Sequence, residues 1–232
     1  MDAWLGEFSH WKNRTRNSCR VLLVCFGNFL KKRGYLQAGL PSVFDSMSTL
    51  KNEIHPVTIY TSDEMHLLLN KARASLLPYL AIGAFAGLRN AEVRRLDWRD
   101  IRFDRGFIEC EASMTKTRRR RLVPMQDNLR AWLEPLRQSS GPVCLHHSLP
   151  GALGALGKQA GLRWKRNALR HSYISYRLAL MPDTARVALE CGNSPDMIFQ
   201  HYRELVTPDE AKAWFNIMPP AGYPKCLLPL RG

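Results

Sequence analysis

The spacing of apolar residues changes period twice along this chain, and this change points to a helical domain that contains one small sheet. Short alternating segments at 101–103, 107–110 and 120–124 predict three strands, and Asp104–Gly106 predicts a turn between the first two. Helical spacing predicts the other elements, at 61–74, 76–85, 90–96, 127–136, 150–160, 166–180, 183–190, 195–202 and 208–216. The expected fold class is mostly α with a small three-stranded antiparallel sheet.

The N-terminal part of the chain is predicted to be a separate segment. Residues 12–34 form one amphipathic helix that ends at Gly34, and residues 35–56 have the Pro, Gly and Ser content of a linker. A lone helix of this kind cannot bury its apolar face. A capping box of Thr61 and Glu64 then opens a new domain. The expected parts are 1–55, a helical segment with its linker; 56–216, the main domain; and 217–232, an irregular tail.

Positive charge is concentrated in two blocks. The chain has 34 Lys and Arg against 20 Asp and Glu, which gives a net charge of +14. Segments 114–122 and 158–181 are basic and contain no acidic residue. Dispersed charge would indicate only solubility, whereas two acid-free blocks favour a polyanionic partner such as nucleic acid.

Other bulk features argue against several classes of protein. No apolar run approaches the roughly 20 residues that a membrane helix needs, and the first residues do not have the pattern of a secretion signal. The six cysteines lack the CxxC pairs and the histidine spacing of a metal site. We therefore expect no metal, no membrane partner and a cytoplasmic location.

Two motifs in the first half of the main domain hold candidate functional cations. Arg89, in Ala86–Val93, follows a glycine at an expected helix start, and Glu92 lies three residues on, where it can orient the guanidinium. An exposed ion pair is the structural alternative. Lys116, in Thr115–Thr117, lies in the connection between the second and third strands. There it is either a ligand-binding lysine or a solvated charge.

Three further motifs follow in the helical second half. Asn167 and Arg170 lie about one turn apart on one face of an expected helix. Arg170 has apolar neighbours, so it should be partly buried and need an anionic partner. Asn193 lies in the turn Gly192–Ser194, and the structural alternative for this motif is a turn that only ends a helix. Tyr202 ends an apolar helix, where the alternative is a tyrosine that serves only the core.

Taken in order, these motifs resemble the successive active-site boxes of tyrosine recombinases, the phage integrase family. They read GLRNAEV, TKTRRRRLVP, ALRHSYIS, CGNSPDMI and FQHYREL, and the resemblance covers about residues 57–216. It implies the DNA breaking-rejoining enzyme fold. It also implies a double-stranded DNA partner, a homo-oligomer assembled on DNA, and association with the nucleoid when the protein is bound.

The resemblance implies a role for each motif residue. Arg89 and Arg170 would hold the oxygens of a DNA phosphate. Tyr202 would attack the phosphorus, form a 3′-phosphotyrosine bond and free a 5′ hydroxyl. Lys116 would protonate that leaving oxygen. No metal or nucleotide cofactor is expected, because the covalent bond conserves the energy for rejoining. Contacts to DNA are expected from Arg118, Arg119, Arg120, Arg121, Lys165 and Arg166.

The chain departs from the family pattern at two site positions and at its N-terminus. Asn167 stands where the family usually has histidine, and Asn193 where it has histidine or tryptophan. Asparagine can hydrogen-bond but cannot exchange a proton near neutral pH. His171 and His201 are each one residue away from a motif position, about 100° around a helix, so neither is assigned to the site. Residues 11–40 resemble only the last helices of the family's core-binding domain, so the resemblance implies that residues 1–55 hold part of it.

These features leave several interpretations. The first is a site-specific recombinase that uses a phosphotyrosine intermediate. The second is a DNA-binding remnant that no longer cleaves, which the two asparagines and the short N-terminal segment favour. An RNA-binding module that uses the arginine-rich connection would need exposed aromatic platforms, and the sequence shows none. A topoisomerase with the same chemistry is the fourth.

Overall fold

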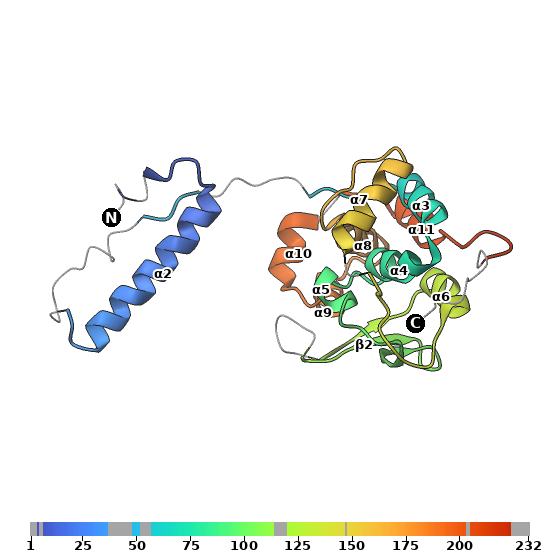
Figure 1. Cartoon of the computed structure of the whole chain (residues 1–232), viewed down its shortest axis with the longest axis horizontal. Coiled ribbons are helices and arrows are strands. Elements are labelled where there is room, and N and C mark those ends of the chain that lie inside the picture. The colour runs from blue at the N-terminus through green and yellow to red at the C-terminus, as the bar shows by residue number, and fades with distance from the viewer. Residues whose placement is uncertain are drawn as a thin grey trace. The chain divides into compact units, whose positions relative to one another are not determined.

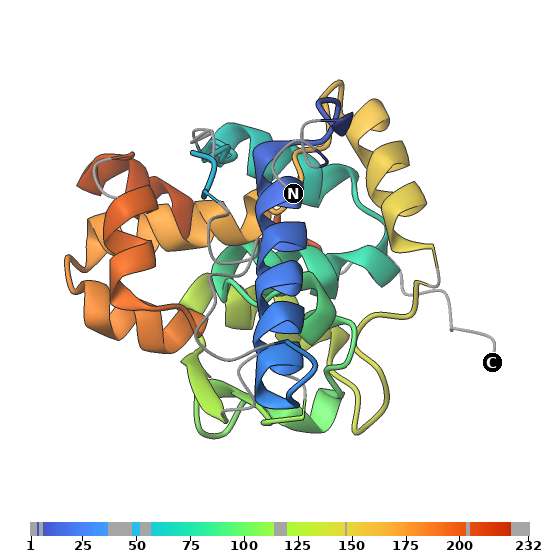
Figure 2. The same cartoon turned by 90° about the vertical axis from the view of Figure 1, so that its left-hand side faces the viewer.

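The chain forms two units, Met1–Pro56 and Val57–Gly232, which we describe separately (Figures 1 and 2). The computed structural model describes residues 4, 7–36, 48–51, 57–113, 120–146, 148–202 and 205–223. None of the helices in these ranges combines the length and the apolar character that a membrane span requires.

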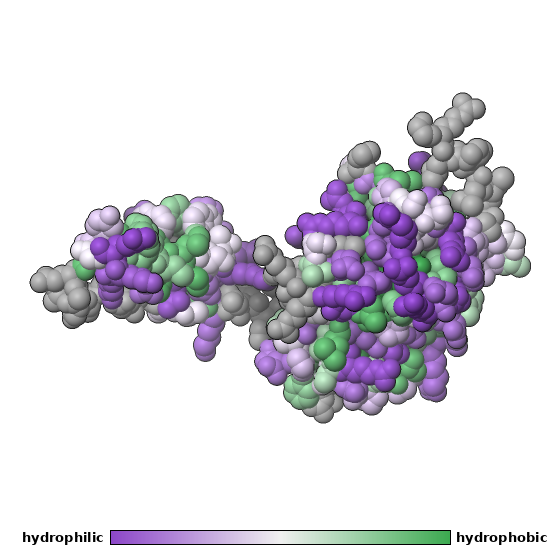
Figure 3. Space-filling view, turned by 90° about the horizontal axis from the view of Figure 1, so that it is seen from below, coloured by the Kyte–Doolittle hydropathy of each residue, from purple (hydrophilic) through white to green (hydrophobic). Residues whose placement is uncertain are grey.

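The first unit is built on one long helix, α2 (Asn13–Lys32). Asn17 forms two hydrogen bonds with the backbone of Leu50: its Nδ2 donates to the carbonyl at 2.8 Å, and its Oδ1 accepts from the N–H at 3.0 Å. The large apolar side chains of α2 remain exposed, with Leu22 at 69% and Phe26 at 54%. Hydrophobic residues accordingly show on the surface of this unit, whereas hydrophilic residues cover most of the visible face of the second (Figure 3).

The second unit is organised around a fully buried helix, α4 (Leu77–Phe85), which follows the 3-10 turn η1 (Ala74–Leu76). All nine residues of α4 are buried, because helices pack on it from several sides. These neighbours are α3 (Ser62–Lys71), α5 (Asn90–Val93), α6 (Asp127–Leu133) and α8 (Ala168–Leu180) (Figure 1). The predicted capping box at the start of α3 is present.

A three-stranded antiparallel sheet lies between α5 and α6 in the chain. Its strands are β1 (Ile101–Arg102), β2 (Phe107–Cys110) and β3 (Arg121–Pro124), in the order β1-β2-β3, after the short turn η2 (Trp98–Asp100). Ile108 pairs with Ile101 on one side and with Val123 on the other, and the three side chains are buried. Since residues alternate between the faces of a strand, Arg121 lies on the same face of β3 as Val123.

A second, smaller core lies in the C-terminal part of this unit. The helices after the sheet, besides α6 and α8, are α7 (Leu149–Gln159), α9 (Thr184–Cys191), α10 (Pro195–Tyr202) and α11 (Pro208–Phe215), and the turn η3 (Glu134–Leu136) extends α6. Helices α8, α9 and α10 contribute this core, which includes Ile174, Val187, Ile198 and Tyr202. Helix α11 joins α8 to the main core, because Trp214 stacks on Tyr176 with ring centroids 4.4 Å apart.

The elements follow the predicted order, and their ends differ where tertiary contacts intervene. Helix α5 ends at Val93 instead of residue 96, because the carbonyl of Leu96 accepts a hydrogen bond from the N–H of Val143. Helix α8 begins at Ala168 instead of residue 166, because Asn167 has a φ of +59° in the left-handed region. The predicted fold class, mostly helical with a small three-stranded antiparallel sheet, is confirmed.

Candidate active site

Arg89 lies at the start of α5, where the chain leaves the buried helix α4. Gly87 has a φ of +63°, and a Cβ on it would lie 2.3 Å from Cδ1 of Tyr173, so this turn requires glycine. The N–H of Arg89 donates to Oε2 of Glu92 at 2.7 Å, and its Nη1 donates to Oε1 at 3.0 Å. Glu92 therefore orients Arg89, as the spacing of the two residues predicted.

Arg121 binds the same carboxylate from the other side. Its Nη2 donates to Oε2 of Glu92 at 2.7 Å, its Nη1 to Oε1 at 3.2 Å, and its Nε to the carbonyl of Glu190 at 3.1 Å. The side chains of Arg121 and Glu92 are 9% and 2% exposed. Burial and these bonds occupy the guanidinium of Arg121 in this structure, and the expected contact of Arg121 with DNA stays a prediction.

The electrostatics of Glu92 are set by its two arginines. Burial alone would raise the pKa of this carboxyl, but the hydrogen bonds and charge of Arg121, with the bonds from Arg89, hold it below the usual value. Glu92 is therefore an anion that orients Arg89 toward the next element of the site.

Arg170 reaches the site from the first turn of α8. Its Nη1 donates to the carbonyl of Gly87 at 2.5 Å, and its Nη2 donates to the carbonyl of Cys191 at 2.7 Å. Burial lowers the pKa of Arg170, and the charges of Arg89 and Arg121 contribute. Its expected anionic partner is replaced by neutral carbonyl oxygens in the described part of the chain. Arg170 thus retains charge that an external anion can neutralise.

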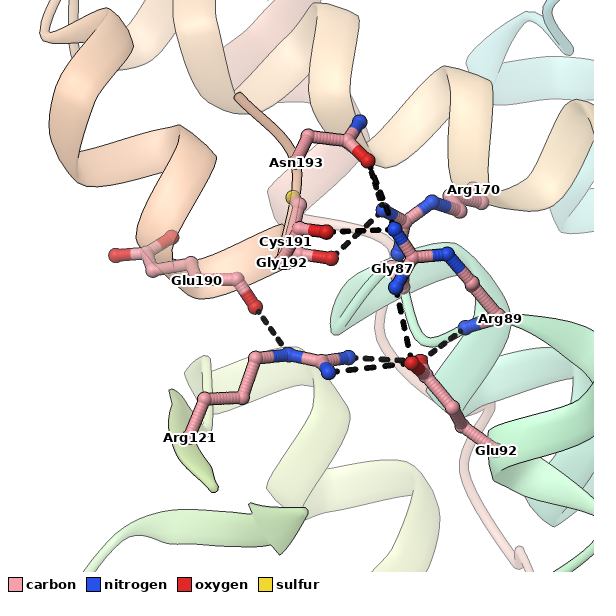
Figure 4. A network of polar contacts seen from close by, with 9 residues as sticks. All are labelled: Gly87, Arg89, Glu92, Arg121, Arg170, Glu190, Cys191, Gly192 and Asn193. Carbon is pink, nitrogen blue, oxygen red and sulfur yellow. Dashed lines mark hydrogen bonds and ion pairs between the residues drawn. The ribbon is translucent and has the colours of Figure 1, made fainter. Parts of the chain in front are cut away.

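The C-terminal end of α9 is the centre of this arrangement (Figure 4). Three consecutive carbonyl oxygens there each accept a hydrogen bond from a different arginine, Glu190 from Arg121, Cys191 from Arg170 and Gly192 from Arg89. The last carbonyls of a helix lack partners within it, and its C-terminus carries partial negative charge. The end of α9 therefore gathers guanidinium groups from α5, β3 and α8.

Asn193 supplies an acceptor that two of these arginines share. Its Oδ1 accepts from Nη2 of Arg89 at 2.9 Å and from Nη2 of Arg170 at 3.0 Å (Figure 4). Gly192 lies beside them with a φ of +65°. The site gathers the guanidinium groups of Arg89, Arg121 and Arg170, and the carboxylate of Glu92 bonds two of them, those of Arg89 and Arg121. The excess positive charge lies around the oxygen of Asn193, where one oxygen atom accepts from both arginines.

The carboxylate of Glu190 is held separately and anchors α9 on α8. It accepts from Nε and Nη2 of Arg177, each at 3.0 Å, and from the hydroxyl of Tyr173 at 3.0 Å. These groups are buried, so the end of α9 is fixed in place before any ligand binds.

Tyr202 ends α10 with its hydroxyl directed at α8. The distance from its Oη to Nδ1 of His171 is 2.6 Å, and the side chain is largely enclosed. Burial raises the pKa of Tyr202, while the charges of Arg170 and Arg89 partly oppose the rise. On this helix Ile198 is buried, whereas Met197 and Phe199 are 47% and 53% exposed.

Comparison with known proteins assigns the family. A model of the phage integrase family matches residues 59–179, just over half of the chain. The chain belongs to the phage integrase family. A tyrosine recombinase XerC from Xanthomonas axonopodis pv. citri (strain 306) is 31% identical over an alignment of 144 residues, and the match covers 56% of this chain and 46% of the relative. XerC of Xanthomonas campestris pv. campestris (strain B100) is also 31% identical. This integrase-family chain thus spans less than half the length of the curated relatives it matches.

Solved structures share the fold of this integrase-family chain. The Tn1549 transposon integrase in complex with circular intermediate DNA superposes with a TM-score of 0.67 at 15% identity, covering 91% of this chain and 82% of that one. The XerH recombinase bound to palindromic difH substrate, a post-cleavage complex, gives a TM-score of 0.67 at 16% identity and covers 87% and 68%. Both likenesses support the tyrosine-recombinase catalytic fold.

The sequence-predicted site position Asn167 is not joined to the arginine cluster. Asn167 is exposed, and as the N-cap of α8 its side chain caps no backbone N–H. It does not share a helical face with Arg170, because its left-handed backbone precedes the helix. Lys116, like Arg118 and Arg119, lies outside the described residues.

The other basic residues expected at DNA differ in how free they are. Arg120 is 62% exposed, and its guanidinium pairs with Glu109 on β2. Lys165 pairs with both carboxylate oxygens of Glu64 at 2.6 and 2.7 Å, so its charge is already compensated. Arg166 is exposed. Arg120 and Arg166 are therefore the more exposed of these residues.

The structure places Arg121 and His171 in contacts that sequence reasoning did not expect. The buried role of Arg121 had a signal, because alternation from the apolar Val123 places it on the inward face of β3. For His171 the sequence held no such signal. The helical angle does direct His171 away from Arg170, but the sequence does not reveal that α10 packs where His171 points. Within the described residues, no group of three or more His, Cys, Asp or Glu could hold a metal ion.

Proposed function

We propose that this chain is a site-specific DNA recombinase or integrase that cuts and rejoins DNA through a 3′-phosphotyrosine bond on Tyr202. One observation carries the proposal: Arg89 and Arg170 direct one nitrogen each at a single oxygen, that of Asn193. A DNA phosphate presents non-bridging oxygens of the same acceptor type with a full negative charge, so it is a stronger ligand for this pair.

The proposed reaction begins when a phosphate oxygen takes the place of the Asn193 oxygen. The excess positive charge of the cluster then stabilises the charge that develops at phosphorus. Because Glu92 and the end of α9 already orient the guanidinium groups, little reorganisation is needed. Turning of the Asn193 amide would let its Nδ2 donate to the same phosphate.

Bond exchange then follows at phosphorus. The Oη of Tyr202 forms the new bond to phosphorus, and the bond to the 5′ oxygen breaks. Lys116 is the proposed donor of a proton to that oxygen. The phosphotyrosine conserves the energy of the broken bond, so the proposal requires no cofactor. Rejoining is the reverse attack by a 5′ hydroxyl.

The proposal includes the partner and the assembly. Relatives of this fold have been solved bound to DNA. We propose double-stranded DNA as the partner, a homo-oligomer assembled on it, and a location with the nucleoid in the cytoplasm. Residues 1–55 are proposed to contribute a partial core-binding segment, 56–216 the catalytic domain, and 217–232 a tail.

A second candidate is a DNA-binding protein of this family that has lost cleavage. Two observations favour it: Asn167 lies apart from the arginine cluster, and Tyr202 is almost fully enclosed. Binding of DNA without covalent chemistry would be expected in that case.

A covalent trapping experiment separates the two candidates. The chain is incubated with a nicked suicide DNA substrate, and a protein–DNA adduct that resists denaturant is expected. Tyr202→Phe keeps the ring, should abolish the adduct and should lower stability by only about 0.5–1.5 kcal/mol. Tyr176→Phe is the matched control, because it removes a hydroxyl that bonds the carbonyl of Tyr60 instead. If the wild-type chain binds DNA as well as Tyr202→Phe does and forms no adduct, the result would support the second candidate.

A further inference from the structure

Two adjacent residues at the start of α8 serve different parts of the site. Arg170 points to the end of α9, and His171, about 100° further around the helix, points to α10. Helices α9 and α10 both pack on α8, so the same helical turn holds an anion-binding cation and the hydroxyl of Tyr202. The 2.6 Å separation between His171 Nδ1 and Tyr202 Oη is that of a strong hydrogen bond.

We propose that His171 is the proton acceptor for Tyr202 in DNA cleavage, and that it returns the proton during rejoining. This inference rests on the proposed function. As Oη bonds to phosphorus, its O–H bond breaks and the proton passes to Nδ1 of His171, while the electron pair of the breaking P–O bond leaves with the 5′ oxygen. In rejoining, the tyrosine oxygen leaves phosphorus and recovers the proton from His171.

The surroundings of His171 suit this role. Burial lowers its pKa, and the charges of Arg170 on the same helix and His201 on α10 act in the same direction. The imidazole is therefore neutral at pH 7, and Nδ1 can accept the hydroxyl proton when the ring carries its proton on Nε2. Because burial raises the pKa of Tyr202, the hydroxyl keeps its proton until attack begins.

Among the described residues, Asn193, Asn167 and Glu92 are not suited to take the proton. Asn193 lies between the arginines, and its amide does not accept a proton near neutral pH. Asn167 has the same limit and is exposed at the N-cap. The carboxylate of Glu92 is occupied by two guanidinium groups. Of these groups and His171, only His171 combines contact with the nucleophile and a lone pair of suitable basicity.

The test compares two replacements of His171 in the complete chain. His171→Asn places an amide oxygen near the position of Nδ1, so it keeps an acceptor for the tyrosine but cannot take the proton. His171→Ala removes both the hydrogen-bond acceptor and the proton acceptor. Rates of adduct formation are measured in a single turnover with the suicide substrate. Both variants should cleave about 10²–10⁴-fold more slowly. His201→Asn, which removes the neighbouring imidazole, should cleave at close to the wild-type rate.

Two further readouts distinguish proton transfer from positioning. The wild-type rate should fall at acidic pH as His171 becomes protonated, and His171→Asn should lack that limb. A substrate with sulfur at the bridging 5′ position has a leaving group that needs no proton. It should restore cleavage by Lys116→Ala but not by His171→Asn. Thermal unfolding of each variant checks that the fold is kept.

The outcomes separate this inference from the proposed function. Cleavage by His171→Asn at the wild-type rate would overturn proton transfer and leave the recombinase proposal standing. Rescue of His171→Asn by the bridging sulfur would mean that His171 assists the leaving group instead of the tyrosine, and this result would also overturn the inference. Failure of the wild-type chain to form any adduct would overturn both.

Discussion

Arg120 and Arg121 are neighbours in the sequence, but replacing each with alanine should have very different effects on stability. The Arg121 side chain is 9% exposed and bonds both oxygens of Glu92, which is 2% exposed. Removing one partner of a buried ion pair typically costs about 3–5 kcal/mol. Glu92 would keep its two bonds from Arg89, so we expect about 3 kcal/mol, the lower end of that range.

The matched variant is Arg120→Ala. Its guanidinium is 62% exposed and pairs with Glu109 in contact with solvent, so its loss should cost at most about 1 kcal/mol. Urea unfolding is measured in a background with Trp4 and Trp11 replaced by phenylalanine, so that all tryptophan fluorescence comes from the second unit. A loss of 3 kcal/mol corresponds to a fall in Tm of roughly 6–12 °C.

Equal and small effects of the two replacements would refute this reasoning. They would mean that Arg121 is solvated in solution and that the ion pair with Glu92 does not organise the site. A larger loss of stability from Arg120→Ala than from Arg121→Ala would mean that Arg120, and not Arg121, lies on the buried face of β3.

Three further predictions follow from single features of the chain. Gly87→Ala should cost about 2–5 kcal/mol in urea unfolding, because it adds both left-handed strain and a steric clash, whereas Gly106→Ala, where the space is open, should cost only about 1–2 kcal/mol. The pKa of Glu92 is lower in the folded protein than its unfolded value of about 4.5, so ionised Glu92 stabilises the fold above that pH. This stabilisation is lost as the pH falls through the folded-state pKa. Glu92→Gln should therefore flatten the dependence of the unfolding free energy on pH in that acid range. Replacing Arg118 and Arg119 together with alanine should weaken binding to all DNA sequences similarly and reduce the slope of log K against log salt by about 2 in a filter-binding titration; an unchanged slope would remove them from the interface.

Local patterns in the sequence determined the elements of the fold and most of the site's composition. The capping box at Thr61, the turn before Gly106 and the helix stop at Gly192 depend on residues a few positions apart, so a sequence carries them directly. The orientation of Arg89 by Glu92 is of the same kind, since the two residues share one helical turn.

Tertiary structure alone decided which side chains far apart in the sequence meet. The end of α9 accepts from Arg89 and Arg121, which lie 103 and 69 residues away from their carbonyl partners in the sequence. The contact between His171 and Tyr202 depends on α10 packing against α8. Such contacts depend on how helix faces pack, and this packing sums many weak apolar interactions across the whole domain. The sequence by itself therefore indicates most residues of this candidate site, whereas tertiary packing determines that Arg121 binds Glu92 and that His171 faces Tyr202, the proposed nucleophile.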